Sequence, residues 1–112
     1  MSEDRLQQEC YIWFHNEYPN LRGLLNYNLN NSANVLQGKK NKAMGLQKGR
    51  SDMEFNYKGE TYFFELKTEK GIQSQRQIEW QELISSQGFD YFIIRKVEIF
   101  KMLIRSIIKS SI

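Results

Sequence analysis

Hydrophobic and polar side chains alternate from residue 49 to residue 67, and this period of two predicts a pair of half-buried β-strands. The glycine in Lys58-Gly59, between the two alternating runs, predicts a two-residue hairpin turn. The register set by this turn pairs Tyr57 with Glu60, Phe55 with Tyr62, and Asp52 with Glu65. Directly opposed side chains on antiparallel strands have Cβ atoms roughly 4.5–5.5 Å apart, so the two acids are expected to be close neighbours.

The same period gives the hairpin a hydrophobic face and a charged face. The core face is predicted to carry Met53, Phe55, Tyr57, Tyr62, Phe64 and Leu66. The opposite face is predicted to carry Asp52, Glu54, Thr61, Phe63, Glu65 and Lys67. Opposed like charges destabilise a strand pair, whereas a Mg²⁺ ion takes oxygen ligands from one or two carboxylates. The alternative is a solvated strand face at Glu65 and Lys67, with Asp52 as a turn residue.

An amphipathic helix is predicted over residues 2–17, with Ser2 as its N-cap. Its apolar arc comprises Leu6, Cys10, Ile12, Trp13 and Phe14. Glu9 falls inside that arc, where an unpartnered carboxylate would be costly to bury. Two interpretations follow for Glu9. It reaches the carboxylate site as an outer ligand or water holder, or it lies at the edge of the arc and bends to solvent.

The segment between this helix and the hairpin becomes polar along its length. Alternating Leu25, Tyr27 and Leu29 predict a first strand within residues 23–30, and residues 30–50 are expected to form a long loop. The loop has five cations and no acids: Lys39, Lys40, Lys42, Lys48 and Arg50. Because the cations directly precede the hairpin, we expect them to contact the phosphates of a nucleic acid. The alternative is a solvated loop, as charge runs often are.

The chain after the hairpin is predicted to turn around Gly71 and to begin a second helix at Ser74. Ser74-x-x-Gln77 has the spacing of a capping box, in which Gln77 bonds back to the N-cap amide. From the first turn of this helix Gln77 could also hold a phosphate or an attacking water, and both roles stay open. The expected core positions of the helix are Ile78, Trp80, Leu83 and Ile84, with Gly88 ending it.

The last part of the chain is strongly hydrophobic. Residues 91–94 (YFII) predict a strand covered on both faces. The final helix is expected to bury Val97, Phe100, Leu103, Ile104, Ile107 and Ile108, beside a stripe of Lys101, Arg105 and Lys109. The width of its apolar surface hints at a dimer contact. The order α-β-β-β-α-β-α predicts an α/β fold, with a mixed sheet of about four strands flanked by helices.

Composition narrows the possible classes of function. A chain of 112 residues is expected to form one domain, residues 1–112. The net charge of +3 and the pI near 9.0 fit a nucleic-acid partner. Cys10 is the only cysteine, which excludes an internal disulfide, so a bound metal would take oxygen ligands. With no signal peptide and no apolar run of ~18 residues, an intracellular, cytoplasmic protein without a membrane segment is expected.

An ordered set of motifs resembles the VRR-NUC branch of the PD-(D/E)XK nuclease superfamily, and the similarity covers nearly the whole chain. The motifs are Glu9 on the opening helix, Gly45-Leu46, Gly49-x-Ser51-Asp52, Phe64-Glu65-Leu66-Lys67-Thr68, Gly71 and Ser74-x-x-Gln77-x-x-Trp80. The family usually has proline directly before the metal-binding aspartate, and this chain has Ser51 there. Proline presets the backbone but supplies no ligand, so the change is expected to be tolerated.

The resemblance implies a restriction-endonuclease-like core and a Mg²⁺- or Mn²⁺-dependent endonuclease that cuts branched or four-way (Holliday) junction DNA. The ion would be held by Asp52, Glu65 and the Leu66 carbonyl, with Glu9 nearby as an outer or direct ligand. Lys67 would orient the attacking water or stabilise charge on the phosphate, and Gln77 would assist. A homodimer with two cleavage sites is also implied, as is a phage or mobile-element origin with action in the host cytoplasm.

Two other functions are compatible with the same residues. One is a non-catalytic nucleic-acid-binding module on the same fold, although a binding protein has no need of Asp52 and Glu65 facing a phosphate. The other is a restriction-type endonuclease, which would require a base-reading element that the sequence does not display.

Overall fold

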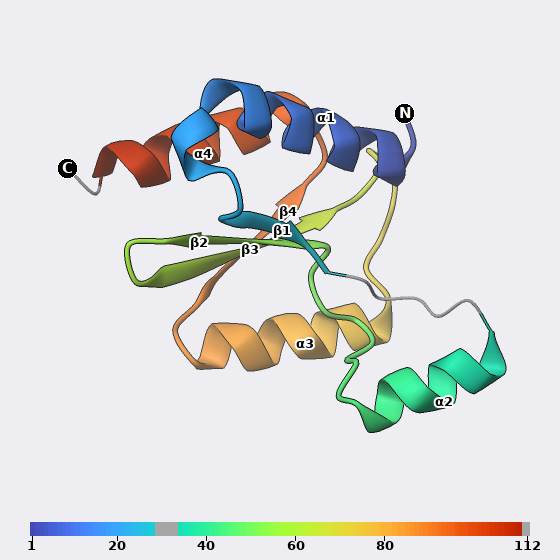
Figure 1. Ribbon diagram of the computed structural model, residues 1–112. Helices are drawn as coiled ribbons and strands as arrows, with labels where there is room; N and C mark the ends of the chain where they lie inside the picture. The colour runs from blue at the N-terminus through green and yellow to red at the C-terminus, as the bar shows by residue number, and fades with distance from the viewer. Residues whose placement is uncertain (29–33, 111–112) are drawn as a thin grey trace.

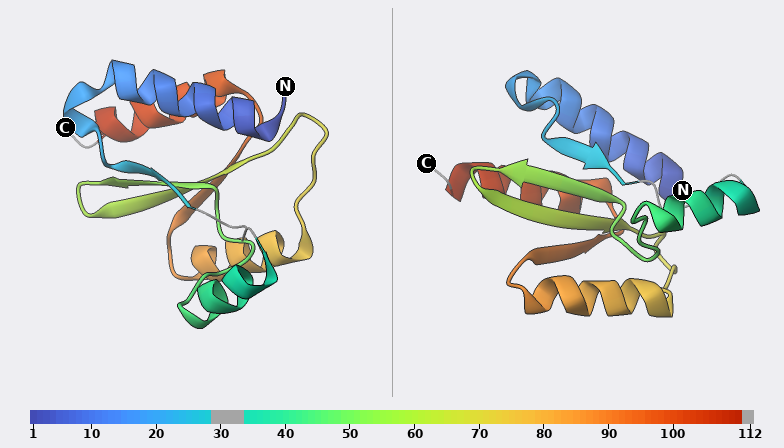
Figure 2. Two further views of the ribbon diagram at one scale, coloured as in Figure 1. Left: turned by 45° about the vertical axis from the view of Figure 1, so that its right-hand side comes forward. Right: turned by 60° about the horizontal axis from the view of Figure 1, so that its bottom comes forward.

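A mixed β-sheet lies between two layers of helices (Figure 1). The computed structural model describes residues 1–28 and 34–110. In chain order the elements are α1 (Glu3–Glu17), the 3₁₀ helix η1 (Pro19–Leu21), β1 (Leu25–Tyr27), α2 (Val35–Ala43), β2 (Met53–Tyr57), β3 (Glu60–Leu66), α3 (Gln75–Ser86), β4 (Asp90–Ile94) and α4 (Val97–Ser110). Helices α1 and α4 cover one face of the sheet and α3 covers the other (Figures 1 and 2). The expected α/β class is confirmed.

The hairpin of β2 and β3 has the register that the turn residues predict. Tyr57 pairs with Glu60 and Phe55 pairs with Tyr62. The backbone φ angles are 48° at Lys58 and 82° at Gly59, as a tight hairpin turn with two left-handed central residues requires. Because a slip of one residue would exchange the two faces, this turn decides which side chains reach the core.

The four strands follow one another across the sheet in the order β1-β2-β3-β4. Strand β2 is antiparallel to both β1 and β3, whereas β4 is parallel to β3. A parallel pair needs a crossover connection, and α3 supplies it. As a result the C-terminal ends of β3 and β4 lie at the same end of the sheet, and so do the residues that follow both strands.

The main core fills the space between the sheet and the pair α1 and α4. It consists of Leu6, Cys10, Phe14, Leu25, Met53, Phe55, Phe64, Leu66, Ile94, Phe100, Ile104 and Ile107. Edge-to-face aromatic contacts tie its layers together, since the ring centroids of Phe14 and Phe55 lie 5.4 Å apart and those of Phe64 and Phe100 lie 5.1 Å apart. On the other face of the sheet, Phe63 packs against Trp80 at 5.2 Å. The predicted core face of the hairpin is therefore confirmed.

The helix ends carry the capping residues that the sequence indicates. Ser2 caps α1 by accepting a hydrogen bond from the Arg5 amide at 3.1 Å. Ser74 and Gln77 form a complete capping box at the start of α3. At the end of α3, Gly88 has φ of +89° and its amide donates to the Ser85 carbonyl, which stops the helix as expected.

The expectation of a continuous loop over residues 30–50 is wrong, because α2 lies within it. Asn34 caps the helix by accepting from the Gln37 amide at 2.8 Å. At the other end, Gly45 has φ of +99° and the Leu46 amide donates to the Asn41 carbonyl, which is the usual way for glycine to end a helix. The helix has no buried residue, so no hydrophobic periodicity marked it in the sequence.

Two other expectations of burial are also wrong. Ile12 on α1 is 57% exposed and Leu83 on α3 is 59% exposed, since α1 buries only Leu6, Cys10 and Phe14 among its described residues and α3 buries none of its residues fully. Leu29, expected in the first strand, lies outside the described residues. In the part of the chain that the structure covers, no helix has both the length and the apolar character needed to cross a bilayer.

Gly49, in the segment that leads into β2, approaches the start of α3 closely. Its φ is +82°, and a Cβ atom placed on it would lie 2.5 Å from the carbonyl oxygen of Arg76. Glycine alone satisfies both the left-handed conformation and the short separation. The residues that precede Asp52 therefore run directly against α3.

Replacing this glycine should destabilise the fold more than replacing one in open space. Gly49→Ala is expected to lower the free energy of unfolding by about 3 kcal/mol, since left-handed strain adds to a backbone clash. Gly45→Ala is the matched control, because its φ is +99° but no atom lies within 4 Å of the added Cβ. It should cost only the strain, about 1–2 kcal/mol. Urea unfolding of both variants measures the difference, and equal losses would contradict the close contact.

Candidate functional site

The candidate site lies at the end of the β2–β3 hairpin opposite its turn. Met53 pairs with Phe64 at the last position of the ladder, so Asp52 and Glu65 follow it on facing strands. Asp52 directly precedes β2. Glu65 is the last residue but one of β3, and Lys67 follows that strand. The structure thus brings these three predicted residues to one end of the hairpin.

Asp52 is fixed by a bond across the hairpin. Its Oδ2 atom accepts a hydrogen bond from the Leu66 backbone amide at 2.7 Å. Burial raises the pKa of Asp52 to about 6, against the lowering effect of the Leu66 hydrogen bond and with a further increase from the charge of Glu65. The charge of Lys67 acts in the opposite direction. The charge of Glu65 therefore opposes the ionisation of Asp52.

The Glu65 carboxylate is buried, and its two oxygens differ in their hydrogen bonds. The residue is 1% exposed. Oε1 accepts hydrogen bonds from the Tyr91 hydroxyl and from the Gln73 amide, the latter at 3.1 Å. Oε2 is buried without a hydrogen-bond partner, and the Lys67 ammonium lies 3.9 Å from it. One carboxylate oxygen is thus held by the protein, while the other is available to a ligand.

Gln73 and Tyr91 were not among the candidate residues from the sequence. Tyr91 reaches Glu65 because β4 is parallel to β3, with Tyr91 paired to Phe63 and therefore on the same face as Glu65. Burial and the hydrogen bond to Glu65 raise the pKa of Tyr91 well above its usual range, so it remains a hydrogen-bond donor. Gln73 also donates to the Gln81 side chain at 2.8 Å, which ties it to α3. The one available signal was the hydroxyl in an otherwise apolar strand.

Ser51 and Asn28 hold the backbone beside Asp52. Ser51 is fully buried and its hydroxyl donates to the Met53 carbonyl at 3.2 Å. The Asn28 amide donates to the Asp52 carbonyl at 2.8 Å, and the Asn28 side chain donates to the Ser51 carbonyl at 3.3 Å. Hydrogen bonds therefore fix the backbone directly before and at Asp52.

Glu9 and Gln77 have other partners. The Glu9 carboxylate pairs with Arg5 at 3.5 Å and lines a hollow of about 250 Å³ together with Thr68 and Glu69, which follow Lys67. The Gln77 side chain accepts from the Ser74 amide at 2.8 Å, as the capping-box interpretation requires. Within residues 1–28 and 34–110, no three side chains of the His, Cys, Asp and Glu types form a group that could hold a metal ion. The further roles of Glu9 and Gln77 stay predictions.

The predicted cations are divided between α2 and the segment after it. Lys39, Lys40 and Lys42 are exposed on α2, at the end of the sheet opposite the β2–β3 turn (Figure 1). Lys48 is exposed as well. Arg50 instead forms a short ion pair with Glu54 on β2. Three of the predicted cations therefore lie exposed on a helix outside the core, whereas Arg50 already has an acidic partner.

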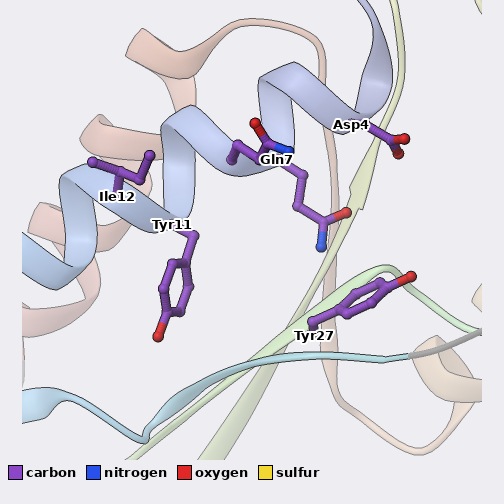
Figure 3. A pocket seen from close by; sticks show the side chains of 6 residues that line it. Asp4, Gln7, Tyr11, Ile12 and Tyr27 are labelled. Carbon is purple, nitrogen blue, oxygen red and sulfur yellow. The ribbon is translucent and has the colours of Figure 1, made fainter.

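A separate hollow of about 390 Å³ lies between α1 and β1 (Figure 3). It is lined by Asp4, Gln7, Gln8, Tyr11, Ile12 and Tyr27. Figure 3 shows Tyr11 reaching from α1 and Tyr27 standing on the strand across from it. Tyr27 pairs with Met53, whose side chain belongs to the core face of the hairpin, and none of the predicted site residues lines the hollow.

Comparison with known proteins identifies the fold. No family model matches the sequence, and a search of curated proteins finds no match. Among solved structures, the chain is similar to a "VRR_NUC domain protein", with a TM-score of 0.81 and 17% sequence identity. The match covers 97% of this chain and 89% of that chain. The protein therefore has the VRR-NUC fold that its motifs indicate.

The raised pKa of Asp52 predicts a pH-dependent cost of keeping this acid ionised. Folding favours the protonated form of Asp52. The stability that this form contributes is complete below about pH 3.8 and is lost as the pH rises through about 6. Asp52→Asn keeps the acceptor for the Leu66 amide and removes the charge. In EDTA at pH 7.5 the variant should be more stable than the parent by about 1–2 kcal/mol, and by much less at pH 4.

Urea unfolding at both pH values measures this difference. Asp90→Asn, the same substitution at an exposed position, is the control for the change of side chain. A loss of stability in Asp52→Asn at pH 7.5 would contradict the assignment of a destabilising buried charge.

Proposed function

We propose that this chain is a metal-dependent endonuclease that hydrolyses phosphodiester bonds in DNA. The observation that carries the proposal is the Glu65 carboxylate, which is buried at the same hairpin end as Asp52, with an Oε2 atom that accepts no hydrogen bond and lies 3.9 Å from the Lys67 ammonium. A buried charged oxygen without a hydrogen bond is costly, so a folded protein retains one where a ligand will occupy it. The VRR-NUC fold supports the same conclusion.

The available donors fit a hard divalent cation. Asp52, Glu65 and the Leu66 carbonyl supply only oxygen atoms, and Mg²⁺ or Mn²⁺ is bound through one or two carboxylates with water and phosphate at its other positions. Two carboxylates and a carbonyl are enough for such a site, so a group of three acidic side chains is not required. A bound ion would lower the pKa of a coordinated water and polarise the scissile phosphate. In this proposal Glu9 is an outer ligand and Gln77 contacts the phosphate or the attacking water.

Lys67 is suited to stabilise negative charge on the phosphate. The residue is only 7% exposed, and its ammonium lies 3.9 Å from Glu65 Oε2, too long for a hydrogen bond. The ammonium is therefore close to the carboxylate without being hydrogen-bonded to it. A preorganised cation in a buried site acts on charge that develops in the transition state. The same position would let Lys67 orient the attacking water.

The substrate part of the proposal rests on the surface around this site. The α2 lysines and Lys48 supply phosphate contacts that carry no base specificity. Branched or four-way junction DNA as the substrate, and a homodimer that presents two cleavage sites, complete the proposal by the resemblance to the VRR-NUC family. A binding module without turnover is the rival that the following experiment separates.

Removing the site residues should abolish cleavage while leaving DNA binding intact. Asp52→Asn, Glu65→Gln and Lys67→Ala are each expected to slow cleavage of a synthetic four-way junction by at least about 100-fold in Mg²⁺ or Mn²⁺. Glu60→Gln, at the exposed start of the same strand, is the matched control and should cut normally. Gel assays of cleavage and of binding in EDTA supply the two readouts. Binding without cleavage by the parent protein in any divalent ion would favour the module.

Neutralising the exposed lysines should weaken DNA binding in a salt-dependent way. Each of Lys39→Ala, Lys40→Ala and Lys42→Ala is expected to lower the slope of log affinity against log salt concentration by about 0.7–0.9 if it removes one phosphate contact. Lys109→Ala, exposed near the end of α4, is the control and should leave the slope unchanged. Fluorescence anisotropy in EDTA measures the slopes. Identical slopes for all four variants would show that the α2 lysines make no phosphate contacts.

A further inference from the structure

The hydrogen bonds on Glu65 make its carboxylate a one-sided ligand. Both neutral donors, Tyr91 and Gln73, bond to Oε1, and none bonds to Oε2. A carboxylate that coordinates an ion through both oxygens needs a free lone pair on each oxygen, directed at that ion. Oε1 already accepts two hydrogen bonds, so only Oε2 can serve an ion without breaking them.

This arrangement resists rotation because three separate elements maintain it. Tyr91 is on β4, Gln73 lies between β3 and α3, and Gln81 on α3 accepts a hydrogen bond from Gln73. The Tyr91 ring also packs against Trp80 with centroids 6.0 Å apart. Turning the carboxylate would break the hydrogen bonds from the Tyr91 hydroxyl and the Gln73 side-chain amide, and would leave both donors unpaired in a largely buried environment. Leaving such groups unpaired is costly, so the carboxylate is held in its present orientation.

The distinction between one and two coordinating oxygens matters because divalent ions differ in it. Ca²⁺ takes six to eight oxygen ligands and commonly binds a carboxylate through both oxygens, whereas Mg²⁺ requires near-octahedral geometry with fewer, single contacts. Mn²⁺ shares the octahedral oxygen preference. A glutamate restricted to Oε2 therefore satisfies Mg²⁺ and Mn²⁺ but leaves Ca²⁺ one ligand short.

We propose that Tyr91 and Gln73 are positioning residues that make the site selective for Mg²⁺ and Mn²⁺ over Ca²⁺, by reserving Oε1 of Glu65 for hydrogen bonds. This inference rests on the proposed function, because it concerns the ion that Asp52 and Glu65 would bind. It assigns a role to the contacts of β4 and of the β3–α3 connection, which the proposed cleavage mechanism does not otherwise use.

Tyr91→Phe and Gln73→Met test the inference, because each removes one donor and retains a side chain of similar size. The amount of Mn²⁺ bound by the full chain without DNA is measured by electron paramagnetic resonance, with Ca²⁺ or Mg²⁺ as the competitor. The parent should lose Mn²⁺ to Mg²⁺ more readily than to Ca²⁺. In either variant the ratio of Ca²⁺ to Mg²⁺ affinity should rise by about 10-fold, as outer-shell substitutions change metal affinity by 10–100-fold.

Tyr62→Phe is the matched control, since this tyrosine is half-buried on β3 but belongs to the opposite face of the sheet. It should leave the ratio at the parent value. An unchanged ratio in both test variants, with Mn²⁺ binding that is abolished by Glu65→Gln, would overturn the selectivity inference alone. If the parent binds no Mn²⁺, the proposed function itself fails. Circular dichroism checks folding, and if one variant does not fold, the other decides the question.

Discussion

The burial of Glu65 is the constraint on which the arrangement of this protein depends. A carboxylate at 1% exposure destabilises a fold unless polar groups compensate for the lost water. Here the compensation comes from outside the hairpin, through the Tyr91 hydroxyl and the Gln73 amide, with Lys67 as the nearby cation. These donors are correctly placed only when β4 has paired with β3 and α3 has packed. The site is therefore complete only in the fully folded chain.

The topology explains how residues distant in sequence reach one carboxylate. The antiparallel hairpin brings Asp52 to Glu65 by local chain reversal, at the end away from Lys58-Gly59. The parallel pairing of β4 brings in Tyr91, which is separated from Glu65 by 26 positions. The crossover between these strands carries Gln73. The α1–α4 layer covers the other face of the sheet, so the main hydrophobic core lies across the sheet from Tyr91 and Gln73 (Figure 1).

Local patterns predicted the hairpin, its register and the capped helix ends, because each depends on a few adjacent residues. The turn at Lys58-Gly59 and the caps at Ser2 and Ser74 are of this kind. Helix α2 escaped prediction because it buries no side chain and so leaves no hydrophobic period, although Asn34 and Gly45 mark its ends. The contacts of Tyr91 and Gln73 with Glu65 could not be predicted, since both depend on parallel pairing across the crossover. The Tyr91 hydroxyl in an otherwise apolar strand marks a polar position but does not identify its partner.

Helix α2 stands outside the core, as none of its residues is buried in the described structure. Its backbone is nevertheless closed at both ends by Asn34 and by Gly45. A substitution on its surface therefore changes how the molecule meets its surroundings without disturbing the packing that supports Glu65. The fold in this way keeps a surface helix separate from the layers whose packing places Tyr91 and Gln73 against Glu65.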